Sequence, residues 1–332
     1  MTKCGLSDRR DFLQMLGWGV AGFAMSKSAL SAAPAKPLRG LFPIGFTPFT
    51  PENKIDLEGL AAQVKFCNRG SVHGLMWPQN ASGWTNLSDQ ERLDGNEAML
   101  SAGKGGKTAL VIGVQSADPD AVSRYAKQAE KLGADGIISL PPPSVSDEKE
   151  ILTYYQKVGG LTGLPLFAQA VGNMSVDLLV EMFKTIPTLR YVKDEAGNPL
   201  ERISELRKRT DDQLKVFSGA GAATMISEME RGFSGACPYT DLADVFAAAF
   251  DLWHKGQKRE AFDMFGRIQA FASITPISSV DIMIARGVFK PGTKLRVASG
   301  GAGGGRGRGA RSLSIEEIRQ ELDAYLKPYL KA

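Results

Sequence analysis

From about residue 40 onward, short apolar segments alternate with segments of helical spacing. Ala109 to Val114 is an almost unbroken apolar run, as expected for a strand covered on both faces of a parallel sheet. After it, Val122, Tyr125, Ala126 and Ala129 recur at the three- and four-residue spacing of a buried helix face. The expected strands are residues 41–47, 72–77, 109–114, 136–140, 166–170, 191–193, 214–218 and 235–238.

About eight strand–helix repeats predict an α/β fold, a parallel (β/α)8 barrel with right-handed crossovers. An open, doubly wound sheet is the second interpretation of the same rhythm. No Gly-x-Gly-x-x-Gly follows the first expected strand, so the sequence does not support a dinucleotide-binding fold.

Residues 1–35 do not fit this rhythm. Ser7 to Leu13 carries an arginine pair, one spacer and then Phe-Leu, which resembles a twin-arginine export signal. A mildly apolar, Gly/Ala-rich run (15–25) and small residues (28–35) follow in the order of an h-region and a cleavage region. We therefore predict a signal peptide over 1–35, export to the periplasm or beyond, and no stable membrane span after its removal. A tail without a signal function is the alternative.

The rest of the chain divides into two predicted regions. Residues 36–240 are expected to form the barrel core, and 241–332 the last barrel helix and a helical C-terminal region. Within the latter, the Gly/Arg-rich stretch 299–311 predicts a flexible surface loop, with a contact to an anionic polymer as the alternative. Ser314-Ile315-Glu316-Glu317 is a capping box that predicts a final helix, and Ser88-Asp89-Gln90-Glu91 is a capping box that predicts a helix in the barrel core.

Composition and charge exclude several classes of protein. A chain of 332 residues with 43% hydrophobic and 23% charged residues is typical of a globular protein with a sizeable core. A formal net charge of +4 is small for this length and does not indicate a nucleic-acid partner. Three cysteines form no disulfide framework, and two histidines have no metal-ligand spacing, so we predict no metal site.

Lys193 is the first candidate for chemistry. It lies at the C-terminal end of the expected strand 191–193, where β/α-barrel enzymes place their catalytic residues, and Gly197 marks the turn that follows. Burial disfavours the ammonium form, so a lysine there is expected to be an uncharged amine that attacks carbonyl carbons. The alternative is a strand-end lysine that reaches solvent and has no chemical role.

Several motifs together, spread over residues 40–330, resemble one family. That family is the dihydrodipicolinate synthase/N-acetylneuraminate lyase family of lysine-dependent aldolases. The motifs are Gly45-Phe46-Thr47-Pro48-Phe49-Thr50 with Ile55-Asp56, Gly133-Ala134-Asp135-Gly136 through Pro141-Pro142, Leu164-Pro165, Val192-Lys193-Asp194 with Ala196-Gly197, and Phe217-Ser218-Gly219.

The resemblance implies a (β/α)8 barrel with a small C-terminal helical region that assembles into a homo-oligomer, a tetramer or a dimer. It implies that Lys193 condenses with the keto group of a small-molecule 2-oxo acid to form a Schiff base. The resulting iminium withdraws electrons and allows carbon–carbon bonds to form or break. No metal or organic cofactor is then needed, because the lysine itself supplies the electrophile.

The sequence departs from the family at the positions that bind substrate and move protons. The threonines of the family's Gly-Thr-Thr-Gly-Glu loop correspond to Asn80 and Ala81 or to Ala81 and Ser82. The family's tyrosine after the fifth strand is absent from 168–171, and the arginine that binds a second carboxylate falls on Asn173 or Met174. We therefore predict a family member that is not a true dihydrodipicolinate synthase.

Replacements for the missing tyrosine are few. Gln169 can orient a water or a carbonyl, Glu195 can reach the barrel mouth, and Tyr239 has a phenol, although ordinary loop packing also explains Tyr239. Asp194 is expected to point away from the interior by strand alternation. The predicted catalytic residues are Lys193, Gln169, Tyr239 and Glu195, and the predicted substrate-binding residues are Asn80, Ala81, Ser82 and Gly219.

Two functions follow from these residues. The first is a lysine-dependent aldolase or lyase that acts on a 2-oxo acid or a sugar-derived keto acid. The second is a catalytically inactive barrel that binds a small anionic or sugar-like solute, with Lys193 as a fixed positive charge.

Overall fold

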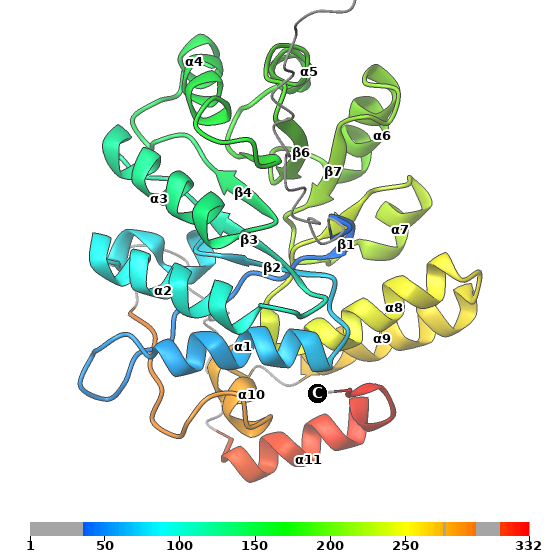
Figure 1. Ribbon diagram of the computed structural model, residues 1–332. Coiled ribbons are helices and arrows are strands. Elements are labelled where there is room, and N and C mark those ends of the chain that lie inside the picture. The colour runs from blue at the N-terminus through cyan, green and yellow to red at the C-terminus, as the bar shows by residue number, and fades with distance from the viewer. Residues whose placement is uncertain (1–35, 275–276, 297–312, 332) are drawn as a thin grey trace, which may run out of the picture. The chain divides into compact units, whose positions relative to one another are not determined.

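A computed structural model describes residues 36–274, 277–296 and 313–331 (Figure 1). Its eight strands form one parallel sheet in the order β1-β8-β7-β6-β5-β4-β3-β2. A parallel bridge between Ile44 and Met76 joins the two ends of this order and completes the ring. The predicted (β/α)8 barrel is therefore confirmed, and the open sheet is excluded. The strands are β1 Gly40–Leu41, β2 Gly74–Trp77, β3 Ala109–Gly113, β4 Gly136–Ser139, β5 Leu166–Ala170, β6 Leu189–Asp194, β7 Lys215–Ser218 and β8 Gly235–Ala236.

Strand bounds differ from the predictions mainly at the first and sixth strands. The expected strand 41–47 is reduced to Gly40–Leu41 with an isolated bridge at Ile44, because Pro43 has no N–H to donate to the ladder. The sixth strand is longer than predicted and extends from Leu189 to Asp194. The polar residues of β6 interrupt the apolar pattern, so the sequence did not predict the full length of the strand. Their place in the sheet depends on contacts with neighbouring strands.

Helices surround the barrel and cover its outer face (Figure 1). The predicted capping boxes are confirmed at Ser88, which begins α2, and at Ser314, which begins α11. Beyond the barrel, α9 packs against α8 and α11, and α10 packs against α11. The helices are α1 Leu57–Arg69, α2 Asp89–Ala102, α3 Pro119–Leu132, α4 Glu148–Gly159, α5 Val176–Thr185, α6 Pro199–Arg209, α7 Met225–Glu230, α8 Ala243–His254, α9 Lys258–Ile274, α10 Ser279–Ala285 and α11 Ile315–Leu326.

Apolar side chains form two clusters, one on each face of the sheet. The larger cluster fills the space between the strands and the helices. The smaller one fills the barrel interior, so the barrel is a packed core and not a pore. Its members are Phe42, Ile44, Met76, Ala109, Val111, Ile138, Phe167, Phe217 and Cys237.

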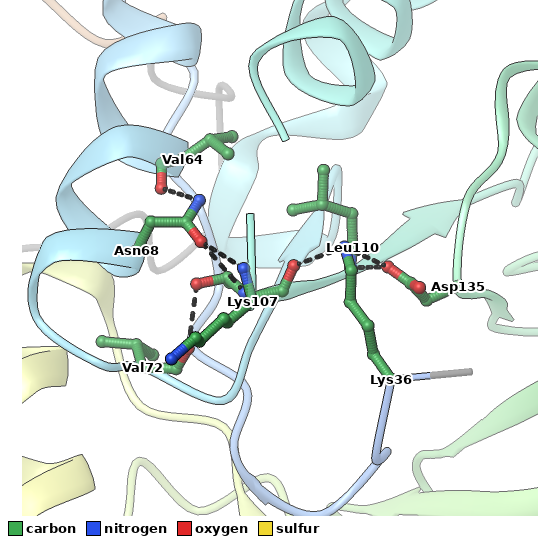
Figure 2. Close-up of polar contacts among 8 residues, drawn as sticks. Lys36, Val64, Asn68, Val72, Lys107, Leu110 and Asp135 are labelled. Carbon is green, nitrogen blue, oxygen red and sulfur yellow. Dashed lines mark hydrogen bonds and ion pairs between the residues drawn. The ribbon is translucent and has the colours of Figure 1, made fainter. Parts of the chain in front are cut away.

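The described chain enters the barrel at its amino-terminal end. The Lys36 ammonium donates to the carbonyl of Thr108 at 3.0 Å and pairs with the Asp135 carboxylate at 3.1 Å (Figure 2). The same carboxylate accepts the backbone N–H of Leu110 at 2.8 Å, and the Asn68 side chain holds the N–H of Lys107 nearby (Figure 2). These contacts fasten the start of the barrel to the loops before β3 and β4, at the opposite end from the carboxyl ends of the strands.

Two predicted segments, the signal peptide at 1–35 and the loop at 299–311, lie outside the described residues. Within the described ranges, no helix has the length and apolar content that crossing a bilayer requires.

Candidate active site at the carboxyl end of the barrel

An aromatic cluster closes the interior beneath Lys193. The rings of Phe167 and Tyr191 stack with centroids 4.3 Å apart, and Phe217 packs edge-on against Phe167 at 5.3 Å and against Phe42 at 5.2 Å. Tyr191 precedes Lys193 by two residues on the same strand, so the two side chains share the inner face. The amine can therefore meet a substrate only from the carboxyl end of the barrel.

Lys193 lies near the end of β6, opposite Gln169 of β5 and Phe217 of β7. The residue is 3% exposed. Its Nζ lies 2.7 Å from Oε1 of Glu195, and the two groups form an ion pair. This contact differs from the expectation of an amine without a charged partner, because a carboxylate lies within hydrogen-bond distance of Nζ.

Three strands fix the position of Glu195. Its backbone N–H donates to the carbonyl of Ala170 at 2.9 Å, and its Oε2 accepts from Nε2 of Gln169 at 2.8 Å. Gly219, the residue after β7, provides the necessary space, since a Cβ there would lie 2.1 Å from Cγ of Glu195. Gly219 therefore allows the ion pair to form, a role that differs from the predicted substrate contact.

Gln169 of β5 is fully buried and lies in register with Lys193 of β6. While its amide nitrogen is bound to Glu195, its Oε1 has no hydrogen-bond partner among the described residues. A buried acceptor without a partner costs free energy, so this oxygen is available to a hydroxyl or water donor. The geometry suits the orienting role predicted for Gln169, which stays a prediction.

Asp194 points out of the interior, as strand alternation predicted. Its Oδ2 accepts from Nε of Arg202 on α6 at 2.8 Å, and its Oδ1 accepts the N–H of Ala196 at 3.1 Å. Burial raises the pKa of Asp194 even though Arg202 acts in the opposite direction. The pair holds the turn that follows Lys193, and with it the backbone of Glu195.

The loop after β2 uses its polar groups to hold its own conformation. The Ser82 hydroxyl donates to the carbonyl of Gly45 at 2.6 Å and accepts the N–H of Gln79 at 3.0 Å. The exposed Asn80 side chain accepts from the Trp84 indole at 2.9 Å. Ala81 packs against the interior cluster. Substrate binding by Asn80, Ala81 and Ser82 stays a prediction, and for Ser82 it would require a change of hydrogen-bond partner.

Tyr239 follows β8, and its ring stacks on Phe46 with centroids 5.6 Å apart. The phenol makes no hydrogen bond to the described residues, and no contact joins it to Lys193. Ordinary loop packing accounts for this arrangement, and a proton-transfer role for Tyr239 stays a prediction.

Sequence comparison with known protein families gives a match that covers most of the barrel. The model of the dihydrodipicolinate synthetase family matches residues 37–286. The chain belongs to this family.

Relatives within the family carry several different activities by name. The 4-hydroxy-tetrahydrodipicolinate synthase of Methanosarcina mazei is 26% identical over 192 residues, which span 56% of this chain and 65% of the synthase. The L-2-keto-3-deoxyarabonate dehydratase of Azospirillum brasilense is 23% identical over 233 residues, which span 68% of this chain and 75% of the dehydratase. The alignment thus spans somewhat less than two thirds of the archaeal synthase.

Solved structures of the same family share the fold at low identity. The N-acetylneuraminate lyase of Mycoplasma synoviae superposes with a TM-score of 0.70 at 21% identity, covering 88% of this chain and 98% of the lyase. The sialic acid aldolase of Ruminococcus gnavus superposes with a TM-score of 0.73 at 18% identity, covering 88% of this chain and 99% of the aldolase. The family contains aldolases and other lyases, and this member is divergent.

Sequence reasoning missed two residues of this dihydrodipicolinate synthetase-family site. Arg202 lies on α6, the helix that follows Asp194, and pairs with that carboxylate. The sequence pattern of α6 does not indicate which residue this arginine contacts. Cys237 lies inside the barrel, and burial raises the pKa of its thiol to about 12, so it stays protonated and does not compete with Lys193 as a nucleophile. Among the described residues, no group of three or more His, Cys, Asp or Glu side chains is placed to hold a metal ion.

Proposed function

We propose that the protein is a lysine-dependent aldolase or lyase that acts on a 2-oxo acid or a sugar-derived keto acid. Lys193 would form an imine with the keto carbon, and the iminium would then stabilise the carbanion formed when a neighbouring bond breaks. One observation carries the proposal. A buried lysine stands at the carboxyl end of β6 in a barrel of this family, above a closed aromatic floor and against a carboxylate.

Synthesis of a dicarboxylate product is not part of the proposal. The positions that correspond to the family's second-carboxylate arginine are Asn173 and Met174, and Met174 is buried in the outer core. The tyrosine position is occupied by the segment around Gln169. A substrate with a single carboxylate and several hydroxyls better suits a site that lacks this arginine.

Trapping of the imine tests the proposal directly. The protein is incubated with pyruvate and with longer, hydroxylated 2-oxo acids, reduced with borohydride and analysed by intact-mass spectrometry. We expect a covalent adduct that is absent in Lys193→Ala and retained in Lys215→Ala. Lys215 is the matched control, because it begins the neighbouring strand at the opposite end of the barrel and pairs with Asp212.

The lack of a phenol beside Lys193 favours a second candidate, a barrel that binds a small solute without chemistry. Among the described residues no phenol is hydrogen-bonded to Lys193 or Glu195, and the ion pair would have to open before Lys193 could bind an anion. Calorimetric binding of a keto acid without any adduct, in the wild-type protein, would establish this function and reject the aldolase.

We also propose that residues 1–35 direct export by the twin-arginine route. The described fold begins with the anchor at Lys36, which lies away from Lys193, so removal of the preceding segment would leave both the anchor and the site in place. A reporter fused to residues 1–40 should be exported, and joint replacement Arg9→Lys and Arg10→Lys should abolish its export. Unchanged export of that variant would contradict the proposal. Homo-oligomer formation stays a prediction, which light scattering of the mature protein would check.

A further inference from the structure

Glu195 is the one carboxylate in contact with the amine of Lys193, within the part of the chain described. We infer that Glu195 is the proton-transfer group of the reaction: it accepts a proton from Lys193 and returns it to the hydroxyl that leaves as water. The inference rests on the proposed function, because it concerns the formation of the imine.

The contacts place the carboxylate where such a transfer requires it. Oε1 lies 2.7 Å from Nζ of Lys193, within the range for direct proton transfer. Oε2 is bound to Gln169, so the carboxylate keeps Oε1 directed at the amine. Gly219 leaves room for this rotamer, and the hydrogen bond from the backbone of Glu195 to Ala170 prevents the loop from carrying it away.

Of the other buried acids, the one on β6 and the one that contacts β7 have partners of their own. Asp194 faces outward and pairs with Arg202. Glu228 accepts hydrogen bonds from Ser218 and Thr224 behind β7, at 2.8 Å each. Neither acid contacts the amine, so Glu195 has no substitute among them.

Imine formation balances in protons and electrons with Lys193, Glu195 and the keto acid alone. The Lys193 ammonium gives one proton to the Glu195 carboxylate, and the free amine attacks the keto carbon, forming the C–N bond while the C=O π electrons move to oxygen. A proton moves from nitrogen to that oxygen, which gives a neutral carbinolamine. Glu195 then donates its proton to the hydroxyl, the C–O bond breaks, water leaves, and the nitrogen lone pair forms the C=N bond. Lys193 ends as an iminium, Glu195 ends as a carboxylate again, and no other reagent is consumed.

This role explains how the family's missing tyrosine is replaced. Carbinolamine formation and water loss both need a group that alternates between acid and base beside the nitrogen. Gln169 occupies the neighbouring strand position and cannot exchange a proton at neutral pH. It acts as a positioning residue, since its amide holds the carboxylate that does exchange one.

The test compares rates of adduct formation. Wild type, Glu195→Gln and the control Glu201→Gln are mixed with pyruvate, reduced with borohydride at timed intervals and weighed. Glu201 is exposed on α6 and gives the same change of charge without contact to Lys193. We expect Glu195→Gln to form the adduct about 10²–10⁴-fold more slowly, with Glu201→Gln unchanged.

A pH profile separates catalysis from a structural effect. In the wild type the proton passes within the pair, so the rate should change little with pH across the neutral range. In Glu195→Gln the amine must lose its proton to solvent, so the rate should rise steadily with pH over the same interval. Matching circular dichroism spectra and unfolding curves would show that the variant is folded.

Gly219→Ala provides an independent perturbation that keeps both reacting groups. The three nearest atoms to the added Cβ all belong to Glu195, so the methyl group displaces the carboxylate. A displacement of this size is expected to slow adduct formation by about 10²-fold. In a Glu195→Ala background the same substitution should cause no further loss, because nothing remains to be displaced.

The outcomes distinguish the two proposals. Equal or faster adduct formation in Glu195→Gln would overturn the inference and make Glu195 a counter-ion that restrains the amine. An equal effect of Gly219→Ala in both backgrounds would also contradict it. Absence of any adduct in the wild type would instead overturn the proposed function itself.

Discussion

We expect the ion pair between Asp194 and Arg202 to contribute strongly to the stability of the fold around the site. The substitution Arg202→Leu tests this expectation. The two side chains are 2% and 13% exposed, and their contact is 2.8 Å long. Leucine keeps most of the apolar stem of the arginine and removes the charge. Asp194 then keeps its hydrogen bond from Ala196 but has no cation beside it.

The expected loss in the free energy of unfolding follows from the burial of the pair. Removal of one partner from a buried ion pair costs about 3–5 kcal/mol, because the remaining charge stays desolvated. Arg209 on the same helix is a matched control, since it pairs with Asp177 and Glu205, whose side chains are 82% and 51% exposed. Arg209→Leu should cost no more than about 1 kcal/mol.

The cost should depend on pH with a definite sign. Burial already raises the pKa of Asp194 above its ordinary value of 3.8, and loss of Arg202 should raise it further. A carboxyl whose folded-state pKa exceeds its unfolded-state pKa binds its proton first in the folded protein. Stability therefore falls as pH rises from the ordinary value to the raised one, by up to about 1.4 kcal/mol per pH unit.

Urea unfolding at several pH values between 5 and 8 measures the effect. We expect the deficit of Arg202→Leu relative to wild type to grow from acid to neutral pH, whereas that of Arg209→Leu stays small throughout. A deficit no larger than that of Arg209→Leu, or one that shrinks as pH rises, would refute the reasoning.

Three further predictions concern the core and the loops around the site. Phe217→Ala removes a ring from the aromatic floor and should lower the free energy of unfolding by about 3–5 kcal/mol in urea titrations, and a loss below about 1 kcal/mol would contradict the packing described. Ser82→Ala leaves the carbonyl of Gly45 and the N–H of Gln79 without their partner, so we expect a loss of about 1–3 kcal/mol and faster hydrogen exchange at Gln79. Unaltered exchange at that amide would speak against the role of the hydroxyl. Burial raises the pKa of Glu228, so wild type loses stability as pH rises from the ordinary value of 4.5 to the raised one, and Glu228→Gln should gain relative to wild type over that range. A relative gain toward acid pH would show that the sign is wrong.

The sequence alone determined the barrel, and it predicted where the chemistry would lie. Apolar runs and helical spacing are local signals, and they located the third to fifth strands to within one residue and both capping boxes at the correct serines. The end of the sixth strand likewise identified Lys193, because the carboxyl ends of parallel strands meet on one face of the barrel.

Only the tertiary structure decided which groups surround that lysine. Gln169 and Glu195 lie 26 residues apart and meet because β5 and β6 are neighbours in register. The sequence predicted substrate binding for Gly219, which stays a prediction, and only the fold showed that Gly219 leaves the space that Glu195 occupies. The direction of a side chain and the charge beside it depend on packing across strands, which no local pattern of residues records, and for that reason the sequence predicted a neutral amine where the fold provides an ion pair.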